Sequence, residues 1–262
     1  MNKLPDPKEF KHYKAKFKKT FYNNTTNYDL NNIYKNLLNA KIPKGYISKL
    51  FNIKILKGCK NVQSILSKYF KYSVRDDTLV IILRDDNQDI KTIAFHRTKA
   101  LNNEVIKWRT LGSKKYIQYN IKDNFVFIVY GMAEIVLCEL LGISYIAFQS
   151  DSIAKGILNN EQWNTIIKPK LSNKHIILLL DNDESCTSTI KPIKENLKGI
   201  VKTIKALSML DLHIMNKAFL YGGKLEKKLP KGYDFRDFCN DVGDYEKIEN
   251  ILKEVIRVKD EF

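Results

Sequence analysis

Acidic residues stand where the sequence predicts that buried strands end. Asp181 and Asp183 come directly after the apolar run 175–180, and Glu134 follows the apolar run 124–130. In an open parallel sheet, functional groups collect at the carboxyl ends of the strands. Two carboxylates separated by one residue, just past a strand, can both face one cation. Mg²⁺ is held in this way, by one or two carboxylates together with water and phosphate oxygens.

The same acids have a structural interpretation. The tract Asp-Asn-Asp-Glu at 181–184 is also typical of a polar turn that caps the following helix. A D-x-D pair alone is a weak signal, and its position after an all-apolar strand favours a metal site. Asp234 and Asp237, in the segment 232–238, are two further candidate acids.

Basic residues outnumber acidic ones across the chain. Its 262 residues include 45 Lys and Arg against 29 Asp and Glu, which gives a net charge of +16 with His neutral. The polyanion that most often matches such a positive field is nucleic acid. Candidate phosphate contacts are Arg97, Arg109, Lys114 and Lys115. For each of them, a solvated surface position is the alternative interpretation.

Strand and helix patterns alternate along most of the chain. The runs 78–85 and 90–97 predict a hairpin, because both are β-rich and a polar turn separates them. Four further strands and the helices between them follow, and this alternation predicts a parallel sheet with helices on both faces. The predicted strands are 124–130, 143–150, 175–180 and 200–207, and the predicted helices include 132–141, 152–158, 161–167 and 192–197.

We divide the sequence into four parts. Residues 1–77 form a basic, mainly helical region, and residues 78–123 hold the hairpin and a basic linker. Residues 124–241 form the main α/β domain, and residues 242–262 form a C-terminal amphipathic helix. Within the first part, aromatic residues at helical spacing alternate with lysines over 10–22. That pattern indicates either a surface that stacks bases or an amphipathic helix with a buried aromatic stripe.

Several classes of protein are excluded by composition. No apolar run approaches the length of a membrane helix, and the lysine-rich N-terminus has no apolar core like that of a secretory signal. We therefore expect a cytoplasmic protein without membrane contact. The four cysteines are tens of residues apart, and none forms the C-x-x-C pair that a zinc finger or ribbon needs.

These motifs together resemble a known family. The tract 130–134, the Asp-Asn-Asp at 181–183 and the tract YDFRDF at 233–238 are similar to the TOPRIM domain of bacterial-type DNA primases, topoisomerases and some nucleases. The tracts ILRD (82–85) and IAFHR (93–97), followed by Lys-Tyr at 115–116, resemble the segment before that domain in the primases. The resemblance covers about 78–241. It implies a TOPRIM (Rossmann-like) parallel sheet flanked by helices, preceded by a smaller α+β primase-like N-terminal subdomain.

The resemblance also implies a function in DNA replication. It implies Mg²⁺-dependent (or Mn²⁺-dependent) nucleotidyl transfer that makes primers from nucleoside triphosphates on single-stranded DNA. Asp181 and Asp183 would bind one or two metal ions, and Glu134 would supply the remaining catalytic carboxylate. Arg97, Lys114 and Lys115 would lie along the template groove. A replicative helicase is the further partner that such a protein would have.

One departure from the family pattern leaves the activity open. The family's motif reads E-G-x-x-D, whereas this chain has Tyr130 at the position of the catalytic Glu, and Glu134 at the position of the Asp. A phenol, with an ordinary pKa of about 10, does not replace a carboxylate at neutral pH. Tyr130 therefore favours a catalytically degenerate relative that binds single-stranded DNA or a replication partner. A TOPRIM nuclease is the other alternative, and the strand pair at 78–97 favours primase descent over it.

Overall fold

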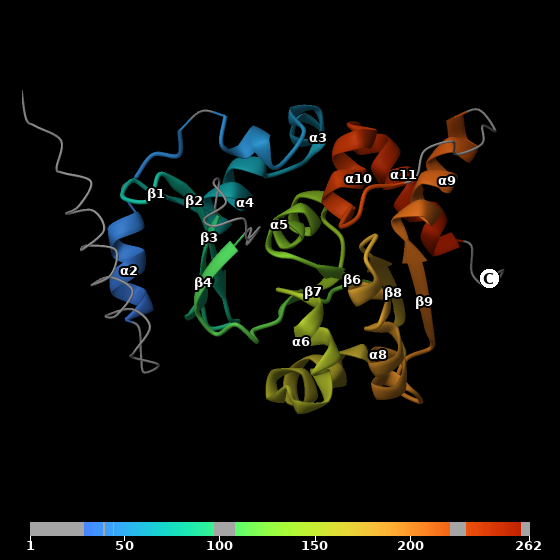
Figure 1. Ribbon diagram of the computed structural model, residues 1–262. Helices are drawn as coiled ribbons and strands as arrows, with labels where there is room; N and C mark the ends of the chain where they lie inside the picture. The colour runs from blue at the N-terminus through green and yellow to red at the C-terminus, as the bar shows by residue number, and fades with distance from the viewer. Residues whose placement is uncertain (1–28, 39, 44, 97–107, 221–228, 258–262) are drawn as a thin grey trace, which may run out of the picture.

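The fold consists of two β-sheets surrounded by helices (Figure 1). The computed structural model describes residues 29–38, 40–43, 45–96, 108–220 and 229–257. The aromatic and lysine-rich segment 10–22 and the candidate residue Arg97 lie outside these ranges. The four-stranded sheet has the order β1-β2-β3-β4, and the five-stranded sheet has the order β5-β7-β6-β8-β9.

The strands have the following bounds. In the four-stranded sheet they are β1 (Phe70–Ser73), β2 (Thr78–Arg84), β3 (Ile90–His96) and β4 (Trp108–Gly112). In the five-stranded sheet they are β5 (Gln118–Asn120), β6 (Phe125–Tyr130), β7 (Tyr145–Phe148), β8 (His175–Leu180) and β9 (Thr203–Ser208).

The helices lie before, between and after these strands. Before the parallel sheet come α2 (Leu30–Leu37), η1 (Ile47–Lys49), α3 (Ile53–Gly58) and α4 (Val62–Tyr69). Within it come α5 (Met132–Leu141), α6 (Asp151–Lys155), η2 (Ile157–Asn159), η3 (Trp163–Ile167), η4 (Lys168–Leu171), α7 (Glu184–Thr187) and α8 (Ile190–Leu197). After β9 come α9 (Met209–Leu220), α10 (Phe235–Val242) and α11 (Tyr245–Arg257).

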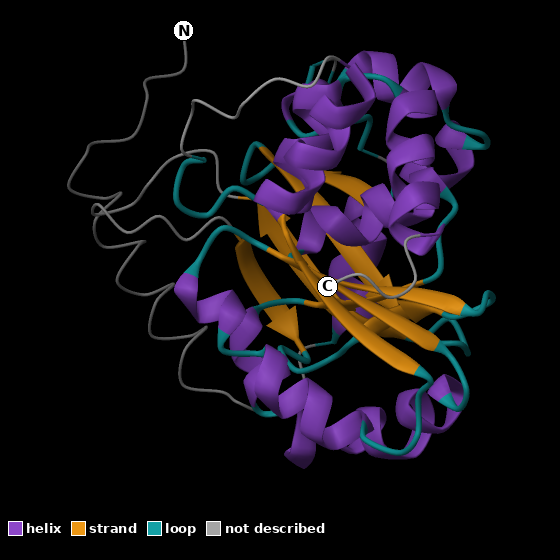
Figure 2. Cartoon of the chain, turned by 90° about the vertical axis from the view of Figure 1, so that its right-hand side faces the viewer, coloured by secondary structure: helices purple, strands orange, loops and turns teal. Residues whose placement is uncertain are grey.

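The five-stranded sheet is mostly parallel. Strands β7, β6, β8 and β9 run parallel, and only the edge strand β5 is antiparallel to its neighbour. Helices cover both faces of the sheet, so the strands form the middle layer in Figure 2. In Figure 1, α5, α9, α10 and α11 lie on one side and α6 and α8 on the other. The predicted α/β fold with a parallel sheet flanked by helices is confirmed.

Alternate residues of β6 face two separate cores. Phe127 and Val129 join a cluster that also includes side chains from α5, α10 and α11. Val126, Ile128 and Tyr130 join a second cluster with side chains from α6, α8 and η3. Because both faces are buried, the sequence of the strand is a continuous apolar run, as expected for a parallel strand between two helical layers.

The smaller sheet packs on the same core as the parallel sheet. Leu79 and Ile81 of β2 belong to the large cluster, whereas Val80 and Ile82, on the other face of the strand, belong with Leu37 of α2 to a third cluster. Ile55 of α3 lies in the large cluster too. The first part of the chain therefore shares its core with the parallel sheet.

The expected sequence boundaries divide elements that hydrogen bonds join. The boundary between 77 and 78 falls in the turn from β1 to β2, where Ser73 pairs with Thr78. Strand β5, within the expected linker 78–123, is the edge of the parallel sheet. Among the residues that the structure describes, no helix is long and apolar enough to cross a membrane.

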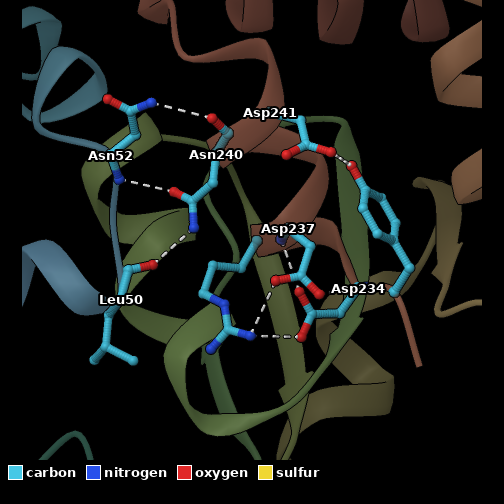
Figure 3. A network of polar contacts seen from close by, with 8 residues as sticks. Leu50, Asn52, Asp234, Asp237, Asn240 and Asp241 are labelled. Carbon is cyan, nitrogen blue, oxygen red and sulfur yellow. Dashed lines mark hydrogen bonds and ion pairs between the residues drawn. The ribbon is translucent and has the colours of Figure 1, made fainter. Parts of the chain in front are cut away.

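A small polar network joins the N-terminal helices to α10 (Figure 3). The backbone N–H of Asn52 donates to Asn240 Oδ1 at 2.8 Å, and Asn52 Nδ2 donates to the Asn240 carbonyl oxygen at 3.1 Å. Asn240 Nδ2 donates to the Leu50 carbonyl oxygen at 2.9 Å. These bonds fix residues 50–52 against a helix that lies 188 residues further along the chain.

Candidate active site

A cleft with acidic walls lies at the carboxyl edge of the parallel sheet. Its volume is about 280 Å³, and Glu134, Asp151, Asp181, Asp183 and Asp234 all line it. Parallel pairing of β6 with β8 explains this arrangement, because it brings the ends of both strands to the same edge. The structure thus brings the three predicted catalytic acids to one cleft.

Glu134 is buried in the first turn of α5. The residue is 3% exposed, and Oε1 accepts no hydrogen bond from the described residues. Burial, followed by the charge of Asp234, raises the pKa of this carboxyl well above its ordinary value, although Arg236 acts in the opposite direction. A buried carboxylate oxygen without a partner is energetically costly, so this oxygen is a candidate ligand for a cation.

Asp183 both lines the cleft and caps a helix. Its Oδ1 accepts a hydrogen bond from the backbone N–H of Ser185 at 2.7 Å, at the N-terminus of α7. This bond is the first cause of a lowered pKa at Asp183. The capping interpretation of the sequence is therefore confirmed, and the same residue also faces the cleft together with Asp181.

The sequence analysis missed Asp151. It stands at the start of α6, just past the end of β7, and its Oδ2 lies 3.1 Å from Lys155 Nζ. Burial acts to raise its pKa, but hydrogen bonds from Ser185 and Lys155 outweigh burial and lower it. The rule applied to Asp181 would also have found this residue, because Asp151 directly follows the predicted strand 143–150.

The two further candidate acids are engaged with each other and with an arginine. Asp234 Oδ1 accepts from the backbone N–H of Asp237 at 2.8 Å, and the two residues form a capping box at the start of α10. Arg236 Nη2 lies 3.0 Å from Asp234 Oδ2 and 3.3 Å from Asp237 Oδ1 (Figure 3). Arg236 lines the cleft and was also missed, although it stands between the two candidate acids in the sequence.

Tyr130 is anchored in the apolar core. Its hydroxyl forms a 2.6 Å hydrogen bond with Thr189 Oγ1, and its ring stacks near Phe148 with 6.0 Å between centroids. Burial raises the pKa of this phenol, so it stays protonated at neutral pH. The residue at the position of the family's catalytic Glu therefore packs in the second core, and it also lines the acidic cleft.

The donor chemistry of the cleft fits a hard divalent cation, because carboxylate oxygens are the ligands that Mg²⁺ takes. Asp181 and Asp183 provide the two carboxylates that would hold such an ion while it keeps several of its water ligands. Within the described ranges, no three His, Cys, Asp or Glu side chains are arranged to hold one metal ion. Glu134, Asp181 and Asp183 thus line one cleft without forming a three-residue metal centre.

A second, basic cleft adjoins the acidic one. Its volume is about 500 Å³, and Lys114 and Lys115 line it. Trp108 and Gln149 line both clefts. Gln149, just past β7, donates from Nε2 to Thr92 Oγ1 of β3 at 3.2 Å, which connects the two sheets at this point. The acidic and basic surfaces are therefore continuous.

Arg109 lies on a different face from the two lysines. It pairs with Phe95 across β3 and β4, and its guanidinium lies 5.8 Å from the Phe95 ring centroid. Phe95 packs against the cluster beside α2. Neighbours in a strand point to opposite faces, so Trp108 lines the clefts while Arg109 faces α2. The structure therefore does not bring Arg109 to the clefts with Lys114 and Lys115.

The chain is an α/β protein with its candidate acids at the carboxyl edge of a parallel sheet. No protein-family model matches the sequence, and no curated protein matches it. Solved structures to which the chain is similar include primase fragments and catalytic cores.

Three of these structures show the extent of the similarity. The primase fragment of the bacteriophage T7 primase-helicase is 16% identical with a TM-score of 0.45, over 74% of this chain and 71% of that one. The Aquifex aeolicus primase, with its zinc-binding and RNA polymerase domains, is 13% identical with a TM-score of 0.42, over 84% and 57%. The RNA polymerase domain of the Mycobacterium tuberculosis primase, solved with a DNA oligomer, is 11% identical with a TM-score of 0.47, over 83% and 75%.

Proposed function

We propose that this chain is a primase-type nucleotidyltransferase core, which makes primers from nucleoside triphosphates on single-stranded DNA with Mg²⁺ or Mn²⁺. One observation carries the proposal: Asp181, Asp183 and Glu134 line a cleft that continues into a cleft lined by Lys114 and Lys115. The motif resemblance to TOPRIM domains supports the same function. It also implies a role in DNA replication, with a replicative helicase as partner.

Each group has a chemical task in this proposal. Asp181 and Asp183 hold the metal ion, which when bound aligns the triphosphate and offsets charge on the transferred phosphoryl group. Lys114 and Lys115 contact template phosphates and fix the strand beside the acids. Glu134 supplies the remaining catalytic carboxylate of the cleft, and burial raises the pKa of this carboxyl above its ordinary value.

A second candidate function is DNA binding without primer synthesis. Two observations favour it: Tyr130 is held by Thr189 within the core, and the Arg236 guanidinium stands among the acids of the cleft. In this case the basic cleft would still bind single-stranded DNA, and the affinity would fall with salt and not depend on Mg²⁺.

Template-directed synthesis on single-stranded DNA with labelled nucleotides tests both candidates. We would compare the wild type with Asp181→Asn and Asp183→Asn, since Asn retains the capping ability of Asp183. Asp86→Asn is the matched control, because Asp86 is an exposed acid that pairs with Lys170 and lies outside the acidic cleft. We expect product from the wild type and from the control, and none from the two cleft variants.

The other outcomes separate the alternatives. Synthesis by Asp181→Asn and Asp183→Asn would contradict a metal-dependent reaction at these acids. No synthesis by the wild type, together with salt-sensitive DNA binding that does not need Mg²⁺, would favour the second candidate. Shortening of labelled DNA during incubation with Mg²⁺ or Mn²⁺ would indicate a nuclease.

A further inference from the structure

Arg236 places a fixed positive charge inside the acidic cleft. Its side chain is 13% exposed and lines the cleft beside Glu134, Asp181 and Asp234. Its Nη2 pairs with Asp234 at 3.0 Å and with Asp237 at 3.3 Å (Figure 3). A guanidinium keeps its charge at any ordinary pH. One side of the cleft is therefore already occupied by a cation that belongs to the chain.

Glu134 supplies an independent observation on that side of the cleft. Its side chain lines the cleft and is almost fully buried, and Oε1 accepts no hydrogen bond within the described residues. Such an oxygen is a ligand position that the chain does not fill. The carboxylates of Glu134 and Asp234 together would suit a divalent ion, but Arg236 already neutralises Asp234 and repels a second cation at short range.

We propose that the Arg236 guanidinium occupies a cation position on the Glu134–Asp234 side of the cleft. The native cleft therefore binds Mg²⁺ or Mn²⁺ only on the Asp181–Asp183 side, one ion fewer than its carboxylates would otherwise hold. The proposal accords with the absence, in the described parts of the chain, of three acids arranged around one ion. It rests on the proposed function for the ion at Asp181 and Asp183.

Counting bound Mn²⁺ in Arg236 variants tests this proposal. Electron paramagnetic resonance of free Mn²⁺, in a titration at fixed protein concentration, gives the number of ions bound per chain. We expect Arg236→Met, which removes the charge and keeps much of the length, to bind one more ion than the wild type. Arg236→Lys keeps the charge and should bind the wild-type number. Arg257→Met, which removes an exposed arginine that pairs with Glu254, is the matched control.

Stability gives a second measurement on the same variants. Arg236→Met removes the guanidinium that pairs with Asp234 and Asp237, so its Tm without metal should be lower than that of the wild type. Added Mn²⁺ should raise the Tm of Arg236→Met more than that of the wild type or of Arg257→Met, because the ion takes the place of the guanidinium.

The result separates this inference from the proposed function. An unchanged ion count in folded Arg236→Met would overturn the inference, as would a variant that stays unfolded at millimolar Mn²⁺. A wild type that binds no Mn²⁺, with one ion gained in Arg236→Met, would support the inference and contradict a metal-dependent wild-type reaction. Asp183→Asn in the Arg236→Met background should remove the native ion and retain the gained one, and loss of the gained ion instead would contradict the inference.

Discussion

Gly131 and Glu134 fit together only because the glycine has no side chain. A Cβ added to Gly131 would lie 2.1 Å from Glu134 Oε2, and the glycine adopts φ +117°. Residues with a Cβ are nearly excluded from this backbone region. The G-x-x-E spacing therefore brings the buried carboxyl against the turn that leads from β6 into α5.

Replacing Gly131 by Ala should destabilise the protein by about 3 kcal/mol or more, because backbone strain and the contact with Glu134 add together. Gly142→Ala is the matched control. Gly142 has φ +69°, and a Cβ added there would meet no atom within 4 Å, so strain alone applies and we expect about 1 kcal/mol. Urea unfolding gives the free energy of unfolding of both variants. Equal losses of this free energy would contradict a contribution from the contact with Glu134.

The buried carboxyl of Glu134 should make stability depend on pH. Folding raises its pKa, so the unfolded chain releases this proton first as pH rises above about 4.3. The contribution of Glu134 to stability is therefore lost progressively from that pH up to the folded pKa. The side chain of Glu134→Gln does not titrate. The free energy of unfolding of this variant should therefore rise relative to that of the wild type by at most about 1.4 kcal/mol per pH unit in this window.

Urea unfolding between pH 4 and pH 8 in the presence of a chelator measures this dependence. Glu161→Gln, at an exposed position, should follow the wild type across the range and serves as the control. A constant difference between Glu134→Gln and the wild type at all pH values would argue against a raised pKa at Glu134.

Lys114 and Lys115 should carry part of the salt dependence of DNA binding. Each contact to a phosphate of single-stranded DNA contributes about 0.7 to the slope of log affinity against log salt concentration. The double variant Lys114→Gln/Lys115→Gln should therefore lower the slope by about 1.4. Fluorescence anisotropy with a labelled oligonucleotide gives the slope for each variant.

The control for this prediction is Lys198→Gln/Lys202→Gln. These lysines lie just before β9, at the amino edge of the sheet and away from the two clefts. Their removal changes the net charge by the same amount, so a similar loss of slope in both double variants would show that the effect is general and not local to the basic cleft.

The Asn240 side chain should contribute to stability by holding residues 50–52 against α10. Its side chain makes hydrogen bonds with the backbone of Leu50 and Asn52, both part-buried. Asn240→Ala should lower the free energy of unfolding by about 2–3 kcal/mol, because two backbone groups lose their partners. Asn164→Ala, which removes one exposed hydrogen bond to Leu158, should cost less than about 1 kcal/mol. Equal losses would contradict a special role for the Asn240 network.

The elements of the parallel sheet could be predicted from local sequence. The run 175–180 and the helix Met132–Leu141 have the predicted bounds, because apolar strands buried on two faces and glycines at both helix ends are strong local signals. The rule that acids collect at the carboxyl ends of parallel strands placed Glu134, Asp181 and Asp183 at one cleft.

Other features of the site depend on contacts between segments far apart in the sequence. Arg236 lies among the acids because α10 packs against α5. Arg109 lies away from the clefts because its face of β4 is the one that packs toward α2. The Tyr130 ring lines the cleft and packs into the second core, because side chains alternate across β6 and its face of the strand meets α6 and α8. Local sequence determines strands, helices and caps, whereas the neighbours of each charge are decided only when the layers pack.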